Sequence, residues 1–336
     1  MTTPTLRFDR ITERWVSVAP ARAFTASSVA GTLPTLSGPC PFCPGHESAT
    51  ERSVYALPSE AAWQVRVVEN RYPVTTSVEG AARLHPSVRE AAAAGLHEVV
   101  VESRDHDGDL GDYSLEQCTL AMRAYRDRVR ALEALPWAHL VAVFRNRGRR
   151  AGSSQPHPHG QIVALAARSD EVELRYALAR SHAEQTGHSL LDEVVEQELA
   201  AGERIIESTE HFVVLCPFAS HRRFELWIVP RSPIASLGAL DDAHLAPLAS
   251  ILGRSARRLA RATNGADYNL VVRSAPPRAP SDAAARTWIE ILPRTGGPAG
   301  YELATGIDIV TLRPEDAAAR LRSVSGDGLE FLKFRG

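Results

Sequence analysis

The chain has 336 residues, enough for one large domain or two ordinary ones, and its formal charge is −2. A charge so near balance favours neither a nucleic-acid partner nor a membrane surface. No window approaches the roughly eighteen apolar residues of a membrane span, and the N-terminus lacks a signal-peptide pattern, so we expect a cytoplasmic protein. Four cysteines are too few for a disulfide framework in so long a chain.

Apolar runs in the first half of the chain predict a series of short strands. In chain order they are residues 6–8, 15–18, 65–68, 97–102, 140–144 and 162–165. A helix is predicted from Ser114 to Leu135, because apolar residues recur there at helical spacing and Pro136 follows. Ser114 and Gln117 have the spacing of a capping box at its start.

The second half of the chain repeats this order. Its predicted elements are a helical connection at 171–203, strands at 212–215, 224–229, 268–272 and 288–292, and a helix at 241–262. At an offset of about 127 to 129 residues, strand 97–101 falls over 224–228 and Arg145 falls over Arg273. We interpret this as a duplicated half-domain, with the two halves at residues 1–168 and 169–336.

The segment from Asn146 to Ile162 carries the densest set of reactive and anion-binding side chains. It contains Gly152-Ser153-Ser154 and then His157-Pro158-His159-Gly160-Gln161, with arginines at its start. Small residues let backbone N–H groups approach an anion, and arginines add charged donors. The two histidines are two residues apart, so in an extended segment they point the same way. A polar hairpin with merely satisfied histidines is the alternative, and the combination of residues favours a phosphate site.

The repeat indicates which half carries the chemistry. The histidine pentapeptide falls over Arg286-Thr287-Trp288-Ile289-Glu290, so Trp288 stands where the first half has His159. We therefore expect one active site per chain, on the first half. The second half would pack, dimerise or complete a neighbour's pocket.

A single CxxC motif, Cys40-Pro41-Phe42-Cys43, lies in a loop rich in proline and glycine. Alone, it is equally a redox pair or a coincidence, but with two well-placed histidines it would form a Cys₂His₂ zinc site. The other cysteines, Cys118 and Cys216, lie in apolar surroundings and are predicted to be core residues.

The histidine pentapeptide and the Gly-Ser-Ser before it resemble the active-site signature of the galactose-1-phosphate uridylyltransferase family. This family is a branch of the histidine-triad (HIT) nucleotide-binding superfamily. The resemblance implies that His159 attacks the α-phosphorus of a nucleoside diphosphate sugar and expels a sugar 1-phosphate. A second sugar 1-phosphate would then collect the nucleotide from the histidine. A neutral imidazole is a competent nucleophile near pH 7, so the residue type suits this chemistry.

The same resemblance implies a structural zinc ion. Its expected ligands are Cys40, Cys43, His106 and His157, which leave no open position for catalysis. Some family members hold a second metal with histidines in the second half. Arg273 and Trp288 occupy two of those places here, so we expect no iron site.

The resemblance also assigns substrate contacts. Ser154 and Gln161 would assist the transfer at the phosphate. The expected substrate-binding residues are Arg22, Asn70, Asn146, Gly152, Ser153, Tyr301 and Glu302. The C-terminal segment that holds Tyr301 and Glu302 matches the family less closely than the histidine motif does. For these two residues a purely structural role is the alternative. Thr25 and Asp308 stand where the family often has a basic residue and another polar residue.

Gln161 is the residue that distinguishes a transferase from a hydrolase. A glutamine donates hydrogen bonds but cannot act as a general acid, and the phosphate leaving group needs no proton, so a transferase is favoured over a hydrolase. The resemblance predicts transfer of UMP to galactose 1-phosphate or a related sugar phosphate. A phosphorylase resembling ADP-glucose phosphorylase is the main alternative. A non-catalytic nucleotide-sugar binder is another, and a nucleic-acid binder finds no support.

The predicted fold class is α+β. Two HIT-like halves would form one continuous antiparallel sheet with helices packed on it, and the family resemblance implies a homodimer. The expected partners are therefore a nucleoside diphosphate sugar, a sugar 1-phosphate and a second copy of the chain.

Overall fold

The computed structural model describes residues 5–18, 39–76, 83–84, 89–90, 93–279 and 282–326. Its strands are β1 (Thr5–Asp9), β2 (Arg14–Val18), β3 (Ser53–Leu57), β4 (Val65–Glu69), β5 (Arg83–Leu84), β6 (Arg89–Glu90), β7 (Gly95–Val101), β8 (Leu140–Arg147), β9 (His159–Leu165), β10 (Ile205–Ser208), β11 (Phe212–Leu215), β12 (Leu226–Pro230), β13 (Tyr268–Arg273), β14 (Trp288–Pro293) and β15 (Asp308–Val310). Its α-helices are α1 (Leu115–Glu133), α2 (Asp170–Thr186), α3 (Leu190–Ala201), α4 (Asp242–Thr263), α5 (Gly300–Thr305) and α6 (Pro314–Ser323).

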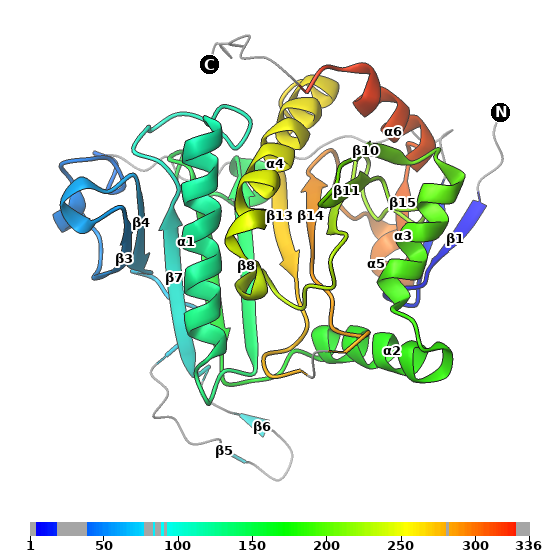
Figure 1. Ribbon diagram of the computed structural model, residues 1–336, viewed down its shortest axis with the longest axis horizontal. Helices are drawn as coiled ribbons and strands as arrows, with labels where there is room; N and C mark the ends of the chain where they lie inside the picture. The colour runs from blue at the N-terminus through cyan, green and yellow to red at the C-terminus, as the bar shows by residue number, and fades with distance from the viewer. Residues whose placement is uncertain are drawn as a thin grey trace.

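The centre of the fold is a ten-stranded antiparallel sheet in the order β10-β11-β12-β14-β13-β8-β9-β7-β4-β3 (Figure 1). The two middle strands, β13 and β8, come from different halves of the chain. Outward from them, both halves repeat one order of strands, which confirms two duplicated half-domains in one continuous sheet. The expected boundary at residue 168 falls in the connection from β9 to α2, and the division into two domains stays a proposal.

Helices cover the two faces of this sheet unequally. The helices α1 and α4 lie side by side across one face, where their apolar residues join those of both halves in one core (Figure 1). On the other face, Leu191 and Val195 of α3 pack against Trp227 and Trp288 of the second half. In the first half this second face carries the side chains of the histidine motif.

The sequence predicted the positions of the long elements, but it made some of the strands too short. The helices α1 and α4 and the strand β11 lie where they were expected, whereas β8 extends to Arg147 and β9 begins at His159. The short elements β3, β10, β15, α5 and α6 were not predicted. At the start of α1, the Ser114 hydroxyl oxygen accepts from Gln117 N, but the Gln117 side chain donates to the carbonyl of Glu102 (2.6 Å). Only half of the expected capping box therefore forms.

The strand registers correct the superposition of the two halves. Phe144 of β8 pairs with Gln161 of β9 and also with Val271 of β13. Val271 in turn pairs with Glu290 of β14. Phe144 and Val271 are therefore counterparts, as are Gln161 and Glu290.

This register makes Asn146, rather than Arg145, the counterpart of Arg273. The predicted match of the two arginines is wrong by one residue, and a one-residue slip exchanges the faces of a strand. Arg145 lies on the α1 side and bonds the buried Glu102 carboxylate (2.9 Å), whereas Arg273 bonds Glu290. Residues 97–101 likewise match 225–229 rather than 224–228.

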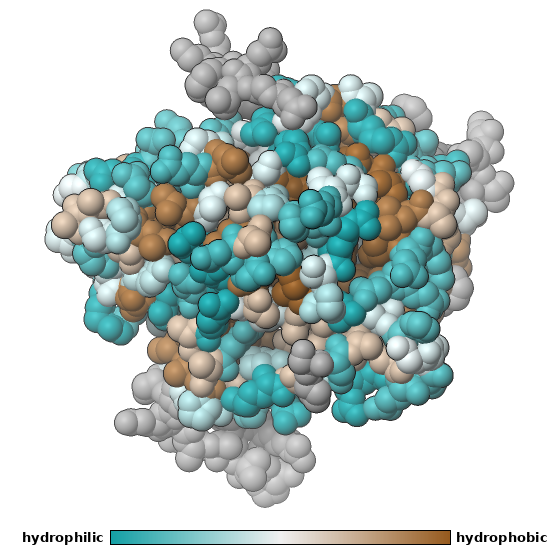
Figure 2. Space-filling model, in the orientation of Figure 1, coloured by the Kyte–Doolittle hydropathy of each residue, from teal (hydrophilic) through white to brown (hydrophobic). Residues whose placement is uncertain are grey.

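None of the helices in the described ranges combines the length and apolar character needed to cross a bilayer. The face that carries α1 and α4 presents hydrophilic residues interspersed with apolar ones (Figure 2).

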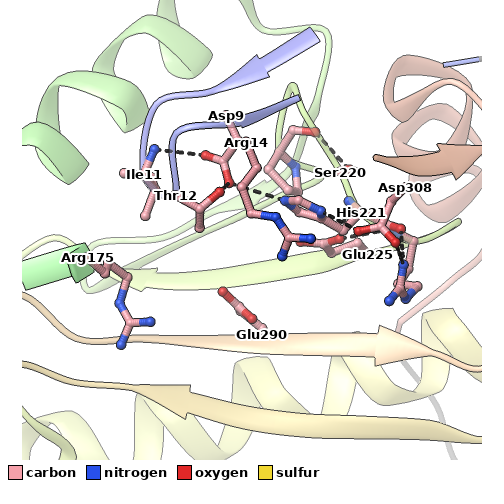
Figure 3. A network of polar contacts seen from close by, with 12 residues as sticks. Asp9, Ile11, Thr12, Arg14, Arg175, Ser220, His221, Glu225, Glu290 and Asp308 are labelled. Carbon is pink, nitrogen blue, oxygen red and sulfur yellow. Dashed lines mark hydrogen bonds and ion pairs between the residues drawn. The ribbon is translucent and has the colours of Figure 1, made fainter. Parts of the chain in front are cut away.

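A small sheet of β1, β2 and β15 is joined to the second half by a histidine between two carboxylates. His221 lies 2.8 Å from Asp308 through Nδ1 and 3.3 Å from Asp9 through Nε2 (Figure 3). Burial alone would lower the pKa of His221, but the two carboxylates outweigh it and raise this pKa to about 10. Burial likewise opposes ionisation of Asp308, whose pKa His221 and Arg222 nevertheless lower to about 2.

This cluster gives the fold a defined dependence on pH. His221 is protonated more readily in the folded than in the unfolded chain, where its pKa is near 6.5. Its contribution to stability is therefore complete below pH 6.5 and is lost as the pH rises to about 10. We expect the difference in free energy of unfolding between wild type and His221→Gln to shrink across this range in urea titrations. A difference that grows with pH would contradict the assignment.

Gly160 lies where the motif strand crosses α1. A Cβ at this position would overlap the hydroxyl oxygen of Tyr125. We expect Gly160→Ala to lower the free energy of unfolding by about 1–3 kcal/mol, because the core must shift to admit the methyl group. Gly160→Ala should cost less in a Tyr125→Phe background, which lacks the overlapping oxygen, than in the wild type, although Tyr125→Phe itself loses the bond to Glu102. Chemical denaturation of the single and double variants measures both effects.

Candidate active site

The loop between β8 and β9 forms one wall of a cavity of about 630 Å³, a size typical of ligand sites. The predicted residues that line it are Asn146, Ser153, Ser154 and His159, with Cys40, His106 and His157 at the metal cluster. The structure therefore brings the two predicted sites together on one cavity. Arg71 and Arg149 also line it, as do Arg145 and Arg147, whose charges are paired with Glu102 and Asp109.

His159 is held in one tautomer. It is 7% exposed, and its Nδ1–H donates to the carbonyl oxygen of His157 at 2.8 Å. Because a carbonyl can only accept, Nδ1 carries the proton and Nε2 keeps its lone pair. Burial also lowers the pKa of His159, so the ring is neutral near pH 7. The ring of Phe42, from the CxxC turn, lies 5.4 Å from it.

A buried carboxylate supports the motif from the α1 side of the sheet. Glu102 is fully buried and accepts hydrogen bonds from Tyr125 Oη (2.7 Å), Tyr113 Oη (3.1 Å) and Arg145 Nε (2.9 Å). Its backbone N–H donates to the carbonyl of Pro158 (3.2 Å), between the two histidines. Burial and the adjacent Glu102 carboxylate raise the pKa of Tyr125 well above its usual value, so the phenol remains a donor.

Gln161 is oriented by a histidine that sequence reasoning missed. His97 Nδ1 accepts from the backbone N–H of Val74 (3.2 Å), so its proton lies on Nε2, which donates to Gln161 Oε1 (2.7 Å). The amide oxygen of Gln161 is thereby occupied and its NH₂ group remains available. Asn70 lies beside this pair, with Nδ2 3.1 Å from His97 Nε2; both nitrogens are donors in this tautomer, so this contact is not a hydrogen bond. Since β7 pairs with β9, the signal was a histidine in the predicted neighbouring strand.

Two glycines shape the loop between β8 and β9, which is the candidate phosphate-binding loop. Gly148 and Gly152 have φ values of +83° and +90°, which favour glycine. The Ser153 hydroxyl donates to the Gln155 carbonyl (2.7 Å), and Ser153 N–H donates to the Gly148 carbonyl (3.1 Å). Ser154 is exposed beside them and lines the cavity.

The cysteines and two histidines form a group that could hold a metal ion. One ligand atom from each of Cys40, Cys43, His106 and His157 lies within 4.8 Å of all the others. Cys43 Sγ is 3.2 Å from His106 Nδ1 and 3.6 Å from His157 Nδ1. His157 Nε2 donates to the carbonyl of Ser103 (2.9 Å), which leaves its Nδ1 lone pair facing the thiols. Two sulfurs and two imidazole nitrogens in this arrangement fit a tetrahedral cation.

The predicted tail contacts lie elsewhere. Tyr301 and Glu302, in α5, line a second cavity of about 280 Å³ together with Arg222 and Asp308. Glu302 also accepts from the backbone N–H of Ala299 (2.9 Å), so part of its role is local. Within the described part of the chain, these two residues are not joined to the cavity of His159. Arg22 lies outside the described residues.

The second half carries different side chains around Trp288, the counterpart of His159. The Arg175 guanidinium lies over the ring of Trp288 at 5.5 Å, and Arg273 bonds both Glu171 and Glu290. Trp288 donates through its indole N–H to Glu290 (3.0 Å). Figure 3 shows Arg175 and Glu290 on this side of the sheet. The expectation of no iron site stays a prediction.

Known proteins resemble this chain over nearly its whole length. The ADP-glucose phosphorylase of Arabidopsis thaliana is 30% identical over 332 residues, which cover 96% of this chain and 93% of that protein. A crystal structure of an ADP-glucose phosphorylase from Arabidopsis thaliana with bound ADP-glucose matches with a TM-score of 0.83 at 30% identity, covering 96% of this chain and 100% of that chain.

A second set of similarities is to galactose-1-phosphate uridylyltransferases. The galactose-1-phosphate uridylyltransferase of Streptomyces lividans is 33% identical over 205 residues, or 61% of this chain and 51% of that protein. The family model for galactose-1-phosphate uridyl transferase, N-terminal domain, matches residues 1–168, the half that carries both the metal cluster and the histidine motif. The chain therefore belongs to the galactose-1-phosphate uridyl transferase family.

Proposed function

We propose that this protein transfers a nucleoside monophosphate from a nucleoside diphosphate sugar to phosphate or a sugar phosphate, in two steps. In the first, His159 Nε2 forms a bond to the α-phosphorus, and the bond from that phosphorus to the bridging oxygen breaks. The sugar 1-phosphate leaves with the electron pair. In the second step an acceptor phosphate oxygen attacks the same phosphorus and releases the histidine.

The observation that carries this proposal is the tautomer of His159. Its Nδ1–H is committed to a backbone carbonyl, so the lone pair of a neutral ring is available at Nε2. The cavity beside it is lined by a glycine–serine loop and by arginines, which suit a diphosphate. Dividing the displacement into two steps at a positioned nucleophile is what covalent catalysis requires.

The other predicted residues receive proposed roles around this step. Gln161, held by His97 through its oxygen, would donate from its NH₂ group to a phosphoryl oxygen. Ser154 would donate its hydroxyl at the same group. The proposed contacts to the nucleotide and phosphates are Arg22, Asn70, Asn146, Gly152 and Ser153.

The choice of donor and acceptor rests on the similarities. The match that spans both halves, to a protein named ADP-glucose phosphorylase, supports adenylyl transfer from ADP-glucose to inorganic phosphate. The match to galactose-1-phosphate uridylyltransferase supports a second candidate, uridylyl transfer to galactose 1-phosphate. We propose the first as the leading reaction, because the 30% identity to the phosphorylase extends over 96% of this chain, whereas the 33% identity to the uridylyltransferase extends over 61% of it.

We further propose that the metal is zinc and that the protein is a homodimer. Two cysteines and two histidines are a donor set typical of structural zinc. Such an ion would join the CxxC turn to the motif and supply folding energy. Tyr301 and Glu302 line a cavity separate from that of His159, which would suit a sugar site completed by a neighbouring copy.

Brief mixing with separate donors tests the mechanism. We expect intact mass to rise by one adenylyl group with ADP-glucose, or by one uridylyl group with UDP-glucose. His159→Ala should give no adduct and lose activity by about 10⁴-fold or more. His188→Ala, which changes an exposed histidine in the α2–α3 turn, should behave as wild type.

Acceptor dependence then separates the candidates. Discharge of the adduct by inorganic phosphate would identify a phosphorylase, and discharge by galactose 1-phosphate would identify a transferase. Rapid discharge in water alone would contradict both. A folded, metal-loaded wild type that forms no adduct with either donor would overturn the covalent mechanism.

Removal of one thiol tests the metal cluster. We expect wild type to contain about one zinc ion per chain and Cys43→Ser to contain almost none, because a serine hydroxyl is a poor zinc ligand. The free energy of unfolding should fall with the metal. Cys118→Ser, in the core near the carbonyl of Ala249, is the matched control and should retain zinc. Elemental analysis showing equal metal in both variants would exclude this site.

A further inference from the structure

We infer that Asn269, in the second half of the chain, is a positioning residue for the active site on the first half. It fixes the side-chain amide of Asn146 so that the Asn146 NH₂ group faces the substrate phosphates. This inference rests on the proposed function, because it assigns a donor to the same cavity. It gives the second half a part in the reaction within its own chain.

Both polar atoms of the Asn269 side chain are hydrogen-bonded. Its Nδ2 donates to Asn146 Oδ1 (2.7 Å) and to the carbonyl oxygen of Ala151 (2.8 Å). Its Oδ1 accepts from Arg294 Nε. An arginine can only donate and a backbone carbonyl can only accept, so the orientation of this amide is not interchangeable.

The fixed amide of Asn269 determines that of Asn146. Asn269 presents a donor, so the oxygen of Asn146 must face it, and the NH₂ group of Asn146 points away from β13. Asn146 lines the cavity of His159, and its Nδ2 lies 3.9 Å from the place where a Cβ on Gly152 would be. The two asparagines are direct partners in the β8–β13 pairing, so the backbone holds them opposite each other.

An NH₂ group at this place suits an anion. It offers donors to a phosphoryl oxygen, whereas the opposite orientation would present a carbonyl oxygen to the phosphates and repel them. The order of bonds is therefore Arg294 to Asn269, Asn269 to Asn146, and Asn146 to substrate.

The same strand of the second half also holds the glycine loop. The bond from Asn269 to the Ala151 carbonyl holds its last turn. Asp267 accepts from the backbone N–H of Arg150 (2.8 Å), and a Cβ on Gly148 would overlap the Asp267 carboxylate. The loop is thus anchored at two points to β13 and the residue before it.

Substitution at Asn269 distinguishes positioning from packing. Asn269→Asp keeps the size of the side chain and its bond to Arg294, but it replaces a donor with an acceptor. The Asn146 amide must then turn its NH₂ group inward. We expect Asn269→Asp and Asn269→Ala each to slow adduct formation in single turnovers by about 10- to 100-fold. They should also weaken binding of ADP or UDP, measured by calorimetry, in the same direction.

A double-mutant cycle with Asn146→Ala is the decisive measurement. If Asn269 acts through Asn146, adding Asn269→Asp to Asn146→Ala should cause a much smaller loss in rate and in nucleotide affinity than Asn269→Asp causes in the wild type, and the loss that remains measures the bond to the Ala151 carbonyl. The matched control is Ser236→Ala, which removes a partly buried hydrogen bond to Glu133 (2.8 Å), and neither residue lines the cavity. Ser236 and Asn269 are both 8% exposed. The control should lower stability and leave the rate unchanged.

Each outcome bears on one proposal or both. Wild-type rates in Asn269→Asp, or losses that multiply with those of Asn146→Ala, would overturn the positioning role. A wild type that binds ADP or UDP without forming an adduct would overturn the covalent mechanism, and the affinity cycle would still decide the role of Asn269. Absence of both binding and adduct would overturn the two together.

Discussion

The buried carboxylate of Glu102 is the interaction on which the rest of the site depends. It lies at the end of β7 and joins α1, through Tyr125, to β8, through Arg145. Its own backbone N–H holds the carbonyl of Pro158, so the spacing of the two motif histidines is tied to it. A buried charge is stable only when its hydrogen bonds are complete. The side chains that pack beneath the histidine motif are therefore held in one arrangement. This arrangement in turn fixes the positions of the motif residues that line the cavity.

The alternation of the strands separates support from chemistry. Gly160 faces α1 and leaves room for Tyr125, while His159 and Gln161, one residue to either side, face the other way. In the second half, α3 covers that other face and Trp288 fills the place of His159. The first half keeps the equivalent face for a ligand. The two halves thus differ mainly in what covers the face of the sheet opposite α1 and α4.

Sequence reasoning predicted much of this because the motif residues are neighbours in the chain. The histidine pentapeptide, the CxxC motif and the long elements are local patterns, and the convergence of Cys40 with His106 followed from family resemblance. The contributions of His97 and Asn269 depend on which residues face each other across strands. Periodicity within one strand does not specify that register, and the match of Arg145 to Arg273 failed by one position for this reason. Arg22 lies outside the described residues.

The pairing of β8 with β13 also bears on the ancestry of the fold. These are equivalent strands of the two halves, so each would be the exposed edge of a half on its own. An exposed edge with unpaired N–H and C=O groups recruits another strand. A shorter ancestor with a single half would have completed its sheet by joining two identical copies through that edge. Fusion of two such copies would leave one half free to hold the loop of the other without carrying a histidine of its own at the position of Trp288.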